Sequence, residues 1–154
     1  MRDLSRRSFV SAAAACAFCC ATATATAQNA SPIASKRVAL KGYDPVSYFT
    51  EGKPEKGLSE VTYAFDDASY WFKSAEHRAK FAADPERYAP QFDGYCTIQV
   101  SRGGKIEPDP KAWTIADGKL YVFSSRAGVP IFQRETAGIV DKANENWPKI
   151  RASH

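Results

Sequence analysis

Alternation of hydrophobic and polar residues along the chain predicts two β-hairpins. In residues 60–73, hydrophobic side chains alternate with polar or small ones on either side of a turn. A second hairpin is predicted over 112–123, because Asp117-Gly118 is a dipeptide that readily forms a tight two-residue turn. A further strand is predicted over 95–101, where every second residue is apolar.

Helical patterns occupy most of the remaining chain. Ser74 and Asp84 are suited to cap helices that begin directly after them, and Pro148 is expected to end the last helix. The predicted helices cover 75–83, 85–89, 130–135 and 136–147, and the short segment 46–49 fits either a strand or a helix. The predicted fold class is therefore α+β: a small antiparallel sheet, built from two hairpins plus one strand and packed with three to four short helices. No internal repeat is apparent in the sequence.

The first 27 residues have the organisation of an export signal. A basic stretch precedes an apolar run from Phe9 to about Ala21, and Ala25-Thr26-Ala27 matches a cleavage site. The apolar run is about 13 residues long, which is shorter than the roughly 18 that a membrane-spanning helix needs. We therefore expect cleavage after about Ala27 and no stable membrane anchor.

Two adjacent arginines, Arg6 and Arg7, stand directly before the bulky apolar pair Phe9-Val10. This arrangement resembles a twin-arginine (Tat) signal, with an ordinary secretory peptide as the alternative. The precursor's expected partner is then the Tat export machinery, and its destination is the periplasm or the exterior of a bacterial cell. Because that route exports folded proteins, the domain is expected to fold before it crosses the membrane.

Removal of the signal leaves 127 of the 154 residues and lowers the formal net charge from +4 to +2. The remaining basic residues are scattered and form no stripe with aromatic residues, so nucleic acid is not an expected partner. The expected layout is a signal at 1–27, a flexible leader at 28–39, one domain at 40–148 and a tail at 149–154. A partner protein or small molecule is not identified by these patterns.

Missing motifs exclude several cofactors. The chain has no Cys-x-x-Cys-His for covalent haem and no glycine-rich loop of the types that bind nucleotides. Three of the four cysteines lie in the signal, so Cys96 alone remains and cannot form an intramolecular disulfide. The cofactor stays unknown, and a transition metal has only weak support.

His77 and Cys96 are the candidate reactive pair. His77 precedes Phe81 by four residues and so shares its inward helix face, and Cys96 lies on the apolar side of its predicted strand. The two could meet as a metal site or as an activated thiolate with its base. The alternative hypothesis is a hydrogen-bonded histidine and a small core thiol that do not act together.

Aromatic residues are dense in the mature chain, and some could line a ligand pocket. Tyr43, Tyr70 and Trp113 are the candidates, together with Asp44 in the turn that precedes Pro45. The alternative interpretation places most of these rings in the core, as their alternation along strands favours.

Three motifs resemble the YHS-domain family. They are Gly42-Tyr43-Asp44-Pro45-Val46-Ser47-Tyr48-Phe49, Tyr70-Trp71-Phe72-Lys73-Ser74-Ala75-Glu76-His77, and the run from Phe81 to Cys96 that contains Asp84-Pro85-Glu86. With Asp117-Gly118-Lys119-Leu120-Tyr121 and Asn146-Trp147-Pro148, the resemblance covers roughly residues 40–148. The chain is similar to the exported, stand-alone branch of that family.

Related YHS and TRASH-type modules occur on metal-transport ATPases and metal-responsive proteins. The resemblance implies a metal-binding cysteine after Asp-Pro-Val and two more around the start of the helix. Those positions are Ser47, Lys73 and His77 here, so His77 is the one potential ligand that remains.

The function expected from these features is a non-enzymatic binding or accessory module, linked to a metal or a small ligand. Its ligand site is expected near the 43–49 turn, His77 and Cys96. The first alternative is a thiol-dependent enzyme or redox protein that uses Cys96 with His77. The second is a structural domain that binds a partner protein without a small ligand.

Overall fold

The computed structural model describes residues 36–152 and has the α+β character predicted from the sequence. The predicted signal at 1–27 lies outside the described residues. The strands are β1 (Arg37–Val38), β2 (Leu58–Phe65), β3 (Ala68–Phe72), β4 (Asp109–Ala116) and β5 (Lys119–Phe123). The helices are α1 (Ser47–Thr50), α2 (Ala75–Ala83), α3 (Pro85–Tyr88), α4 (Thr97–Ser101), α5 (Gly128–Arg134) and α6 (Thr136–Arg151), with 3₁₀ turns η1 (Ala39–Gly42) and η2 (Gln91–Gly94).

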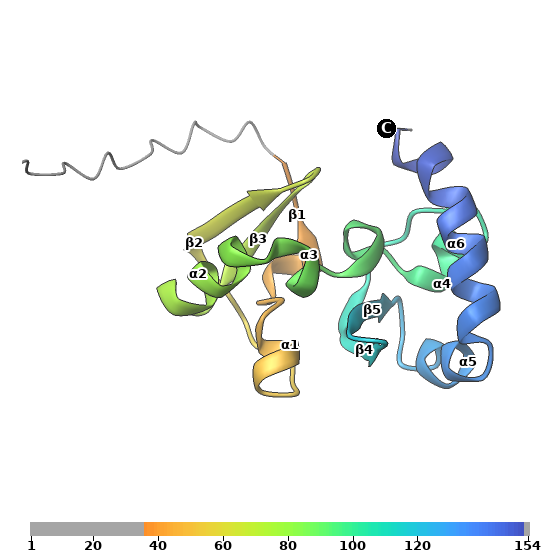
Figure 1. Cartoon of the computed structure of the whole chain (residues 1–154), viewed down its shortest axis with the longest axis horizontal. Coiled ribbons are helices and arrows are strands. Elements are labelled where there is room, and N and C mark those ends of the chain that lie inside the picture. The colour runs from red at the N-terminus through yellow and green to blue at the C-terminus, as the bar shows by residue number, and fades with distance from the viewer. Residues whose placement is uncertain (1–35, 153–154) are drawn as a thin grey trace, which may run out of the picture. The chain divides into compact units, whose positions relative to one another are not determined.

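The first sheet has the strand order β1-β3-β2. Strands β2 and β3 form the predicted antiparallel hairpin, and β1 pairs with β3 in parallel. Helix α2 lies beside this sheet (Figure 1) and presents Phe81, whose fully buried ring packs against the rings of Tyr70 and Phe72. These side chains form the centre of the first hydrophobic core.

The second sheet consists of β4 and β5, which form the other predicted hairpin. Its turn residues Asp117 and Gly118 have φ angles of 50° and 72°, the left-handed backbone that a tight primed turn requires. Phe132 from α5 packs against Tyr121 and Phe123 of β5. With residues from α4 and α6, these rings form the second hydrophobic core.

Strand β5 belongs to both cores. Leu120 and Val122 are buried in the first core, whereas Tyr121 and Phe123 are buried in the second. This division follows from the strand geometry, because successive side chains point to opposite faces. The strand therefore carries hydrophobic residues at adjacent positions, as a strand buried on both faces does.

The prediction of a strand over residues 95–101 is wrong. The chain reverses at η2 and continues into helix α4, which buries Ile98 and Val100 against the second core. Asn146 of α6 donates its side-chain amide hydrogens to the carbonyls of Val100 and Ser101, which satisfies the end of the short helix. The extra strand of the fold is instead β1, so the sheets are two rather than one and are not wholly antiparallel.

The helices also differ from the prediction in number and length. Six are present among residues 36–152 rather than three or four, and α5 begins at Gly128 rather than at Pro130. Helix α6 continues through Pro148, which lacks one backbone hydrogen bond but does not end the helix. Its last turn is held by Arg151, which forms ion pairs with Asp66, Asp67 and Asp93. None of the helices in this part of the chain is long and apolar enough to cross a membrane.

The folded region is longer than the predicted domain of 40–148 at both ends. Arg37 and Val38 already pair with β3, and Ala39 is fully buried. At the other end, α6 extends to Arg151. Residues 37–39 of the predicted flexible leader therefore belong to β1 and η1, and the predicted tail begins inside a helix.

Candidate functional site

The centre of the candidate site is a fully buried carboxylate, Asp44, in the turn between η1 and α1. Its Oδ1 accepts a hydrogen bond from the Val46 amide at 2.8 Å, and its Oδ2 accepts one from the Lys73 amide at 2.9 Å. The contact with Val46 is the local Asx turn that an aspartate forms with the backbone two residues further on. The contact with Lys73 joins this turn to the end of the β2–β3 hairpin.

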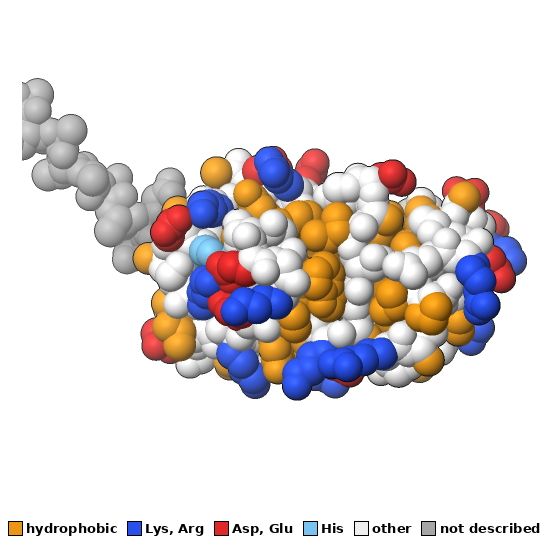
Figure 2. Space-filling view, turned by 90° about the horizontal axis from the view of Figure 1, so that it is seen from below, with side chains coloured by type: hydrophobic (Ala, Val, Ile, Leu, Met, Phe, Trp, Pro, Cys, Tyr) orange, Lys and Arg blue, Asp and Glu red, His pale blue; other side chains and the backbone are white. Residues whose placement is uncertain are grey.

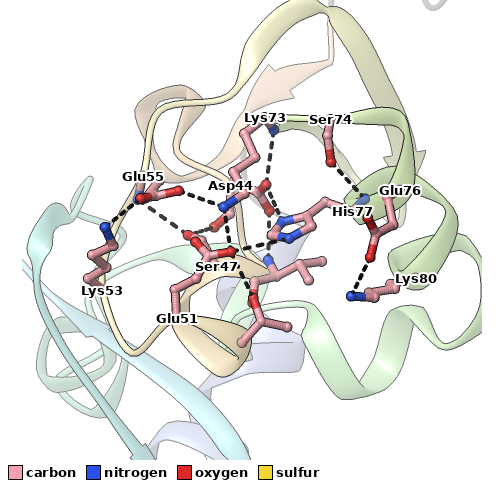
Figure 3. A network of polar contacts seen from close by, with 12 residues as sticks. Asp44, Ser47, Glu51, Lys53, Glu55, Lys73, Ser74, Glu76, His77 and Lys80 are labelled. Atoms are coloured by element: carbon pink, nitrogen blue, oxygen red, sulfur yellow. Dashed lines mark hydrogen bonds and ion pairs between the residues drawn. The ribbon is translucent and has the colours of Figure 1, made fainter.

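His77 lies next to this carboxylate, in the first turn of α2. Ser74 begins the helix as predicted, because its hydroxyl oxygen accepts a hydrogen bond from the His77 amide at 3.2 Å. The imidazole is almost fully buried, and its Nδ1 lies 2.7 Å from Asp44 Oδ2 (Figure 3). An ionised carboxylate can only accept, so Nδ1 carries a hydrogen and Nε2 is the atom left for other chemistry.

A group of surface charges surrounds the exposed edge of the imidazole. Glu51 Oε1 lies 3.4 Å from His77 Nε2, and the Lys73 ammonium contacts both Glu51 and Glu55. Hydrogen bonds from Lys53 and Lys73 lower the pKa of Glu55 from its ordinary value of 4.5 to about 2. We call Asp44, Glu51, Glu55, Lys73 and His77 the His77 cluster.

The His77 cluster reaches the molecular surface. Figure 2 shows a histidine side chain at the surface with acidic and basic side chains beside it, and a band of hydrophobic side chains next to them. The side chains of Glu51 and Lys73 are 25% and 32% exposed, against 6% for His77. A ligand that meets Nε2 would therefore also meet Glu51 and Lys73.

The geometry of the Asp44–His77 pair is one that proteins use for metal-binding and proton-transferring histidines. A carboxylate on one ring nitrogen fixes the tautomer and raises the basicity of the other nitrogen. Within residues 36–152, however, no group of three or more His, Cys, Asp or Glu side chains could hold a metal ion. The cluster offers two protein ligands at most, His77 Nε2 and the Glu51 carboxylate.

The hydroxyl of Ser47 has a structural role in this turn. Its hydroxyl donates a hydrogen bond to the Asp44 carbonyl at 2.7 Å and accepts one from the Glu55 amide at 3.3 Å. These contacts hold the turn against the 51–57 loop. Ser47 therefore supports the position of Asp44 rather than facing a ligand.

Cys96 does not contact His77, which fits the alternative hypothesis that the two residues do not act together. Its thiol is 1% exposed in the second core, and its Sγ lies 3.6 Å from Ser124 Oγ. It lines a small cavity of about 150 Å³ together with Phe123 and Gly128. His77 instead contacts Asp44, a candidate that the sequence analysis had not paired with it.

The three aromatic candidates do not share a pocket. Tyr43 is half-buried beneath the ammonium of Lys56, and Trp113 packs edge-on against Tyr48 with ring centres 5.1 Å apart. Tyr70 is 1% exposed and packs on Phe81, and burial raises its pKa. The core interpretation thus fits Tyr70 and Trp113.

Tyr70 also lines a cleft of about 500 Å³. Its walls combine aromatic rings with charged side chains: Phe65, Asp66, Tyr70, Glu86, Ala89, Pro90, Gln91, Phe92, Asp93, Lys119, Asn144, Trp147 and Arg151. Much of its charge is already paired, because Arg151 bridges Asp66 and Asp93.

Glu51 and Glu55 were not identified from the sequence, and Lys73 was noted only as a position where the resemblance implies a cysteine. No spacing rule links an acidic loop to a residue at the end of a hairpin, since their contacts form only when the 51–57 loop folds back onto Lys73. The one available signal was the surplus of charge in the loop around Pro54.

Fold and site together define an α+β domain with a buried carboxylate–histidine pair whose free nitrogen faces a charged surface cluster. Comparison of the chain with protein-family models, with curated proteins and with solved structures found no match in any of the three. The functional argument therefore depends on the residues of the site itself.

Proposed function

We propose that this chain is an exported, non-enzymatic binding module of the YHS type, whose ligand site is the His77 cluster. The resemblance to YHS domains supports this proposal because Asp44, Lys73 and His77 all lie within the motifs that carry it. Their contacts with one another give these motif positions a common purpose, which is to present one imidazole nitrogen at the surface.

The ligand proposed for this site is a divalent transition-metal ion. Neutral imidazole and carboxylate are suitable ligands for such ions, and His77 Nε2 and Glu51 Oε1 are 3.4 Å apart, a separation that a shared ion can bridge. Two protein ligands leave the other coordination positions to water or to a group from a partner. Such a site would hold its metal weakly and exchange it, as an accessory or transfer module requires.

The observation that carries the proposal is the 2.7 Å contact between Asp44 Oδ2 and His77 Nδ1. Outer carboxylates of this kind orient metal-binding histidines and are worth roughly 10–100-fold in affinity. The charge of Lys73 opposes a cation at the same place, because its ammonium contacts Glu51. Binding and release would then follow the movement of the Lys73 side chain away from Glu51.

The experiment is a titration of the folded, signal-free chain with Zn²⁺, followed by NMR of ¹⁵N-labelled histidine. Wild-type protein is expected to show a saturable shift of the His77 Nε2 resonance. The His77→Gln variant should lose the specific binding event, and Glu51→Gln should weaken it. Lys73→Met should tighten binding, since it frees the Glu51 carboxylate.

Cys96→Ser is the matched control, because Cys96 lies in the other core and contacts no member of the cluster. It should bind Zn²⁺ as wild type does. Binding that survives His77→Gln, or that disappears with Cys96→Ser, would overturn the assignment of the site to the His77 cluster.

A further inference from the structure

The two hairpins have the same register, although their sequences differ. In the first, Thr62 pairs with Trp71 and Phe65 with Ala68. In the second, Trp113 pairs with Val122 and Ala116 with Lys119, each 51 positions further along the chain. Both ladders also shift register at the same place, between Leu58 and Thr62 in one and between Asp109 and Trp113 in the other.

The turns before the hairpins are also equivalent. Leu40, Lys41 and Gly42 have φ angles of 52°, 52° and 78°, and Phe92, Asp93 and Gly94 have angles of 56°, 51° and 77°. Three consecutive left-handed residues are rare, especially with non-glycine residues at two of the three positions. A tyrosine follows each turn, and its amide donates to the carbonyl three residues back at 3.0 Å in both cases. A short helix then follows, α1 in the first case and α4 in the second.

The same equivalence extends to the strand that begins each segment. Val38 pairs in parallel with Ser69, and Pro90 pairs in parallel with Leu120. Proline has no amide hydrogen to donate, which explains why the second contact is an isolated bridge and the first a short strand.

Side-chain packing in the two cores matches as well. The rings of Tyr70 and Phe81 are 4.9 Å apart at 35°, and those of Tyr121 and Phe132 are 4.8 Å apart at 38°. The second ring pair of each core, Phe72 with Phe81 and Phe123 with Phe132, is 5.1 Å apart at 58° and 5.3 Å apart at 51°. A single residue separates α2 from α3, which starts at Pro85. A single residue likewise separates α5 from α6, which starts at Thr136.

We propose that residues 37–139 are two tandem copies of one structural unit, and that the second copy retains a counterpart of the His77 cluster that lacks the histidine. The repeat is not apparent in the sequence because few residues are shared between the two copies. They are Gly42, Tyr43, Asp66, Tyr70, Phe72, Ser74 and Phe81, with Gly94, Tyr95, Asp117, Tyr121, Phe123, Ser125 and Phe132 as their equivalents. These residues lie at the left-handed turns, just before the helix that follows each hairpin, or among the core rings.

The positions of the site can be followed from one copy to the other. Asp44, Lys73 and His77 correspond to Cys96, Ser124 and Gly128. Asp44 and Cys96 both donate their amide hydrogens at 2.9 Å to a carbonyl of the loop that precedes the hairpin, that of Glu55 in one copy and of Ile106 in the other. The Asp44–Lys73 contact has its equivalent in Cys96 and Ser124, whose side chains are 3.6 Å apart.

The histidine has no replacement in the second copy. Gly128 stands in its place, and Cys96, Ser124 and Gly128 line the cavity of about 150 Å³. In the first copy, the imidazole lies between Asp44 and the surface charges (Figure 3). We infer that ligand binding is confined to the first copy, and that the second copy is a scaffold in which the corresponding space is left empty.

The test rebuilds the first-copy arrangement in the second copy with the triple variant C96D/I98V/G128H in the full mature chain. The change at Ile98 is included because a Cβ at Gly128 would lie 3.3 Å from Ile98 Cδ1, and the first copy has the smaller Val46 there. Such a Cβ would also lie 2.9 Å from Phe123 Cβ, so the backbone of β5 or the start of α5 must shift to make room. The matched control is C96N/I98V/G128H, which lacks the carboxylate.

The measurement is NMR of ¹⁵N-labelled histidine without any metal, so it is independent of the proposed function. Wild type should give one exchange-protected Nδ1–H resonance, from His77, and C96D/I98V/G128H should give two. The control should give one. A folded triple variant whose new imidazole exchanges freely and titrates like a solvent-exposed histidine would overturn the equivalence of the two sites.

If the triple variant fails to fold, C96D/I98V tests half of the same geometry. Its new carboxylate should accept the amides of residues 98 and 124, as Asp44 accepts those of Val46 and Lys73. Both amide protons should then move downfield and exchange more slowly than in wild type. Unchanged amide resonances in a folded C96D/I98V protein would contradict the proposal.

Discussion

At the scale of single residues, Asp44 is the side chain with the greatest structural consequence. It is fully buried, and its two oxygens accept two backbone amides and face one imidazole nitrogen. A buried carboxylate is tolerated only when its charge is satisfied in this way. Asp44 therefore positions His77 and at the same time joins the 43–46 turn to the end of β3.

Asp44→Asn should destabilise the domain by about 3 kcal/mol, because an amide NH₂ would face a backbone amide or the His77 Nδ1–H. Urea denaturation measures the loss. Glu51→Gln is the control, since Glu51 is 25% exposed and its removal should cost less than about 1 kcal/mol. Equal losses for both variants would contradict the central position given to Asp44.

Glu55 should make the stability of the domain depend on pH in the acid range. Hydrogen bonds from Lys53 and Lys73 lower its pKa in the folded state from 4.5 to about 2. Its stabilising contribution is therefore fully present above pH 4.5 and is lost as the pH falls toward 2. Glu55→Gln should flatten the stability profile between these values and leave its slope above pH 5 unchanged.

Denaturation midpoints measured across pH 2–7 test this prediction. Because the Glu55 side chain is partly exposed, the effect should shrink in 1 M salt. An acid slope that Glu55→Gln leaves intact would assign the effect to another carboxyl group.

At the scale of elements, each hairpin turns tightly through at least one residue with left-handed backbone. Asp66 and Asp117 both have a φ of 50°, and Gly118 has a φ of 72°. Nothing lies within 4 Å of a Cβ built at Gly118, so a side chain there would meet no steric barrier other than its own backbone. A substitution at Gly118 therefore measures the cost of backbone strain alone, without a change in side-chain packing.

Gly118→Val should destabilise the domain by about 1–3 kcal/mol through that strain alone. Gly138→Ala is the matched control, because Gly138 lies in α6, has no positive φ and also has open space at its Cβ. It should stabilise the domain by roughly 0.4–1 kcal/mol. Thermal denaturation of both variants measures these changes in stability. If Gly118→Val leaves the stability unchanged, the turn has relaxed to another geometry.

At the scale of the whole described molecule, β5 makes the two cores depend on each other. Its alternate residues are buried on opposite sides, and further contacts cross between the halves. The Tyr48 hydroxyl donates to the Pro110 carbonyl at 2.9 Å, and Arg37 pairs with Glu107. The two halves are therefore expected to unfold together.

Leu120→Ala should lower the stability of both halves by the same amount, about 2–5 kcal/mol, because Leu120 is fully buried on the shared strand. The three tryptophans allow the two cores to be followed separately. Trp71 lies in β3, Trp113 packs against the first core, and Trp147 packs against the second. Trp147→Phe and the double variant Trp71→Phe/Trp113→Phe give separate fluorescence signals. Their denaturation midpoints should coincide in the presence and absence of Leu120→Ala, and separate midpoints would show two independent units.

The sequence by itself determined the features that arise from neighbouring residues. Both hairpins, the cap at Ser74 and the turn at Asp117-Gly118 were predicted because each depends on hydrogen bonds and φ angles within a few residues. The candidate site was found in part, since Asp44 and His77 were both identified, but not as a pair.

Only the tertiary structure decided the features that depend on distant contacts. Residues 97–101 form a helix because α6 packs on them and Asn146 caps their end, although the local pattern of 95–101 fits a strand. His77 meets Asp44 rather than Cys96 because β3 brings residues 33 positions apart together. The proposed repeat rests on the register of the hairpins, the left-handed turns and the packing of the core rings, because a duplicated fold needs these features but tolerates almost any other residue.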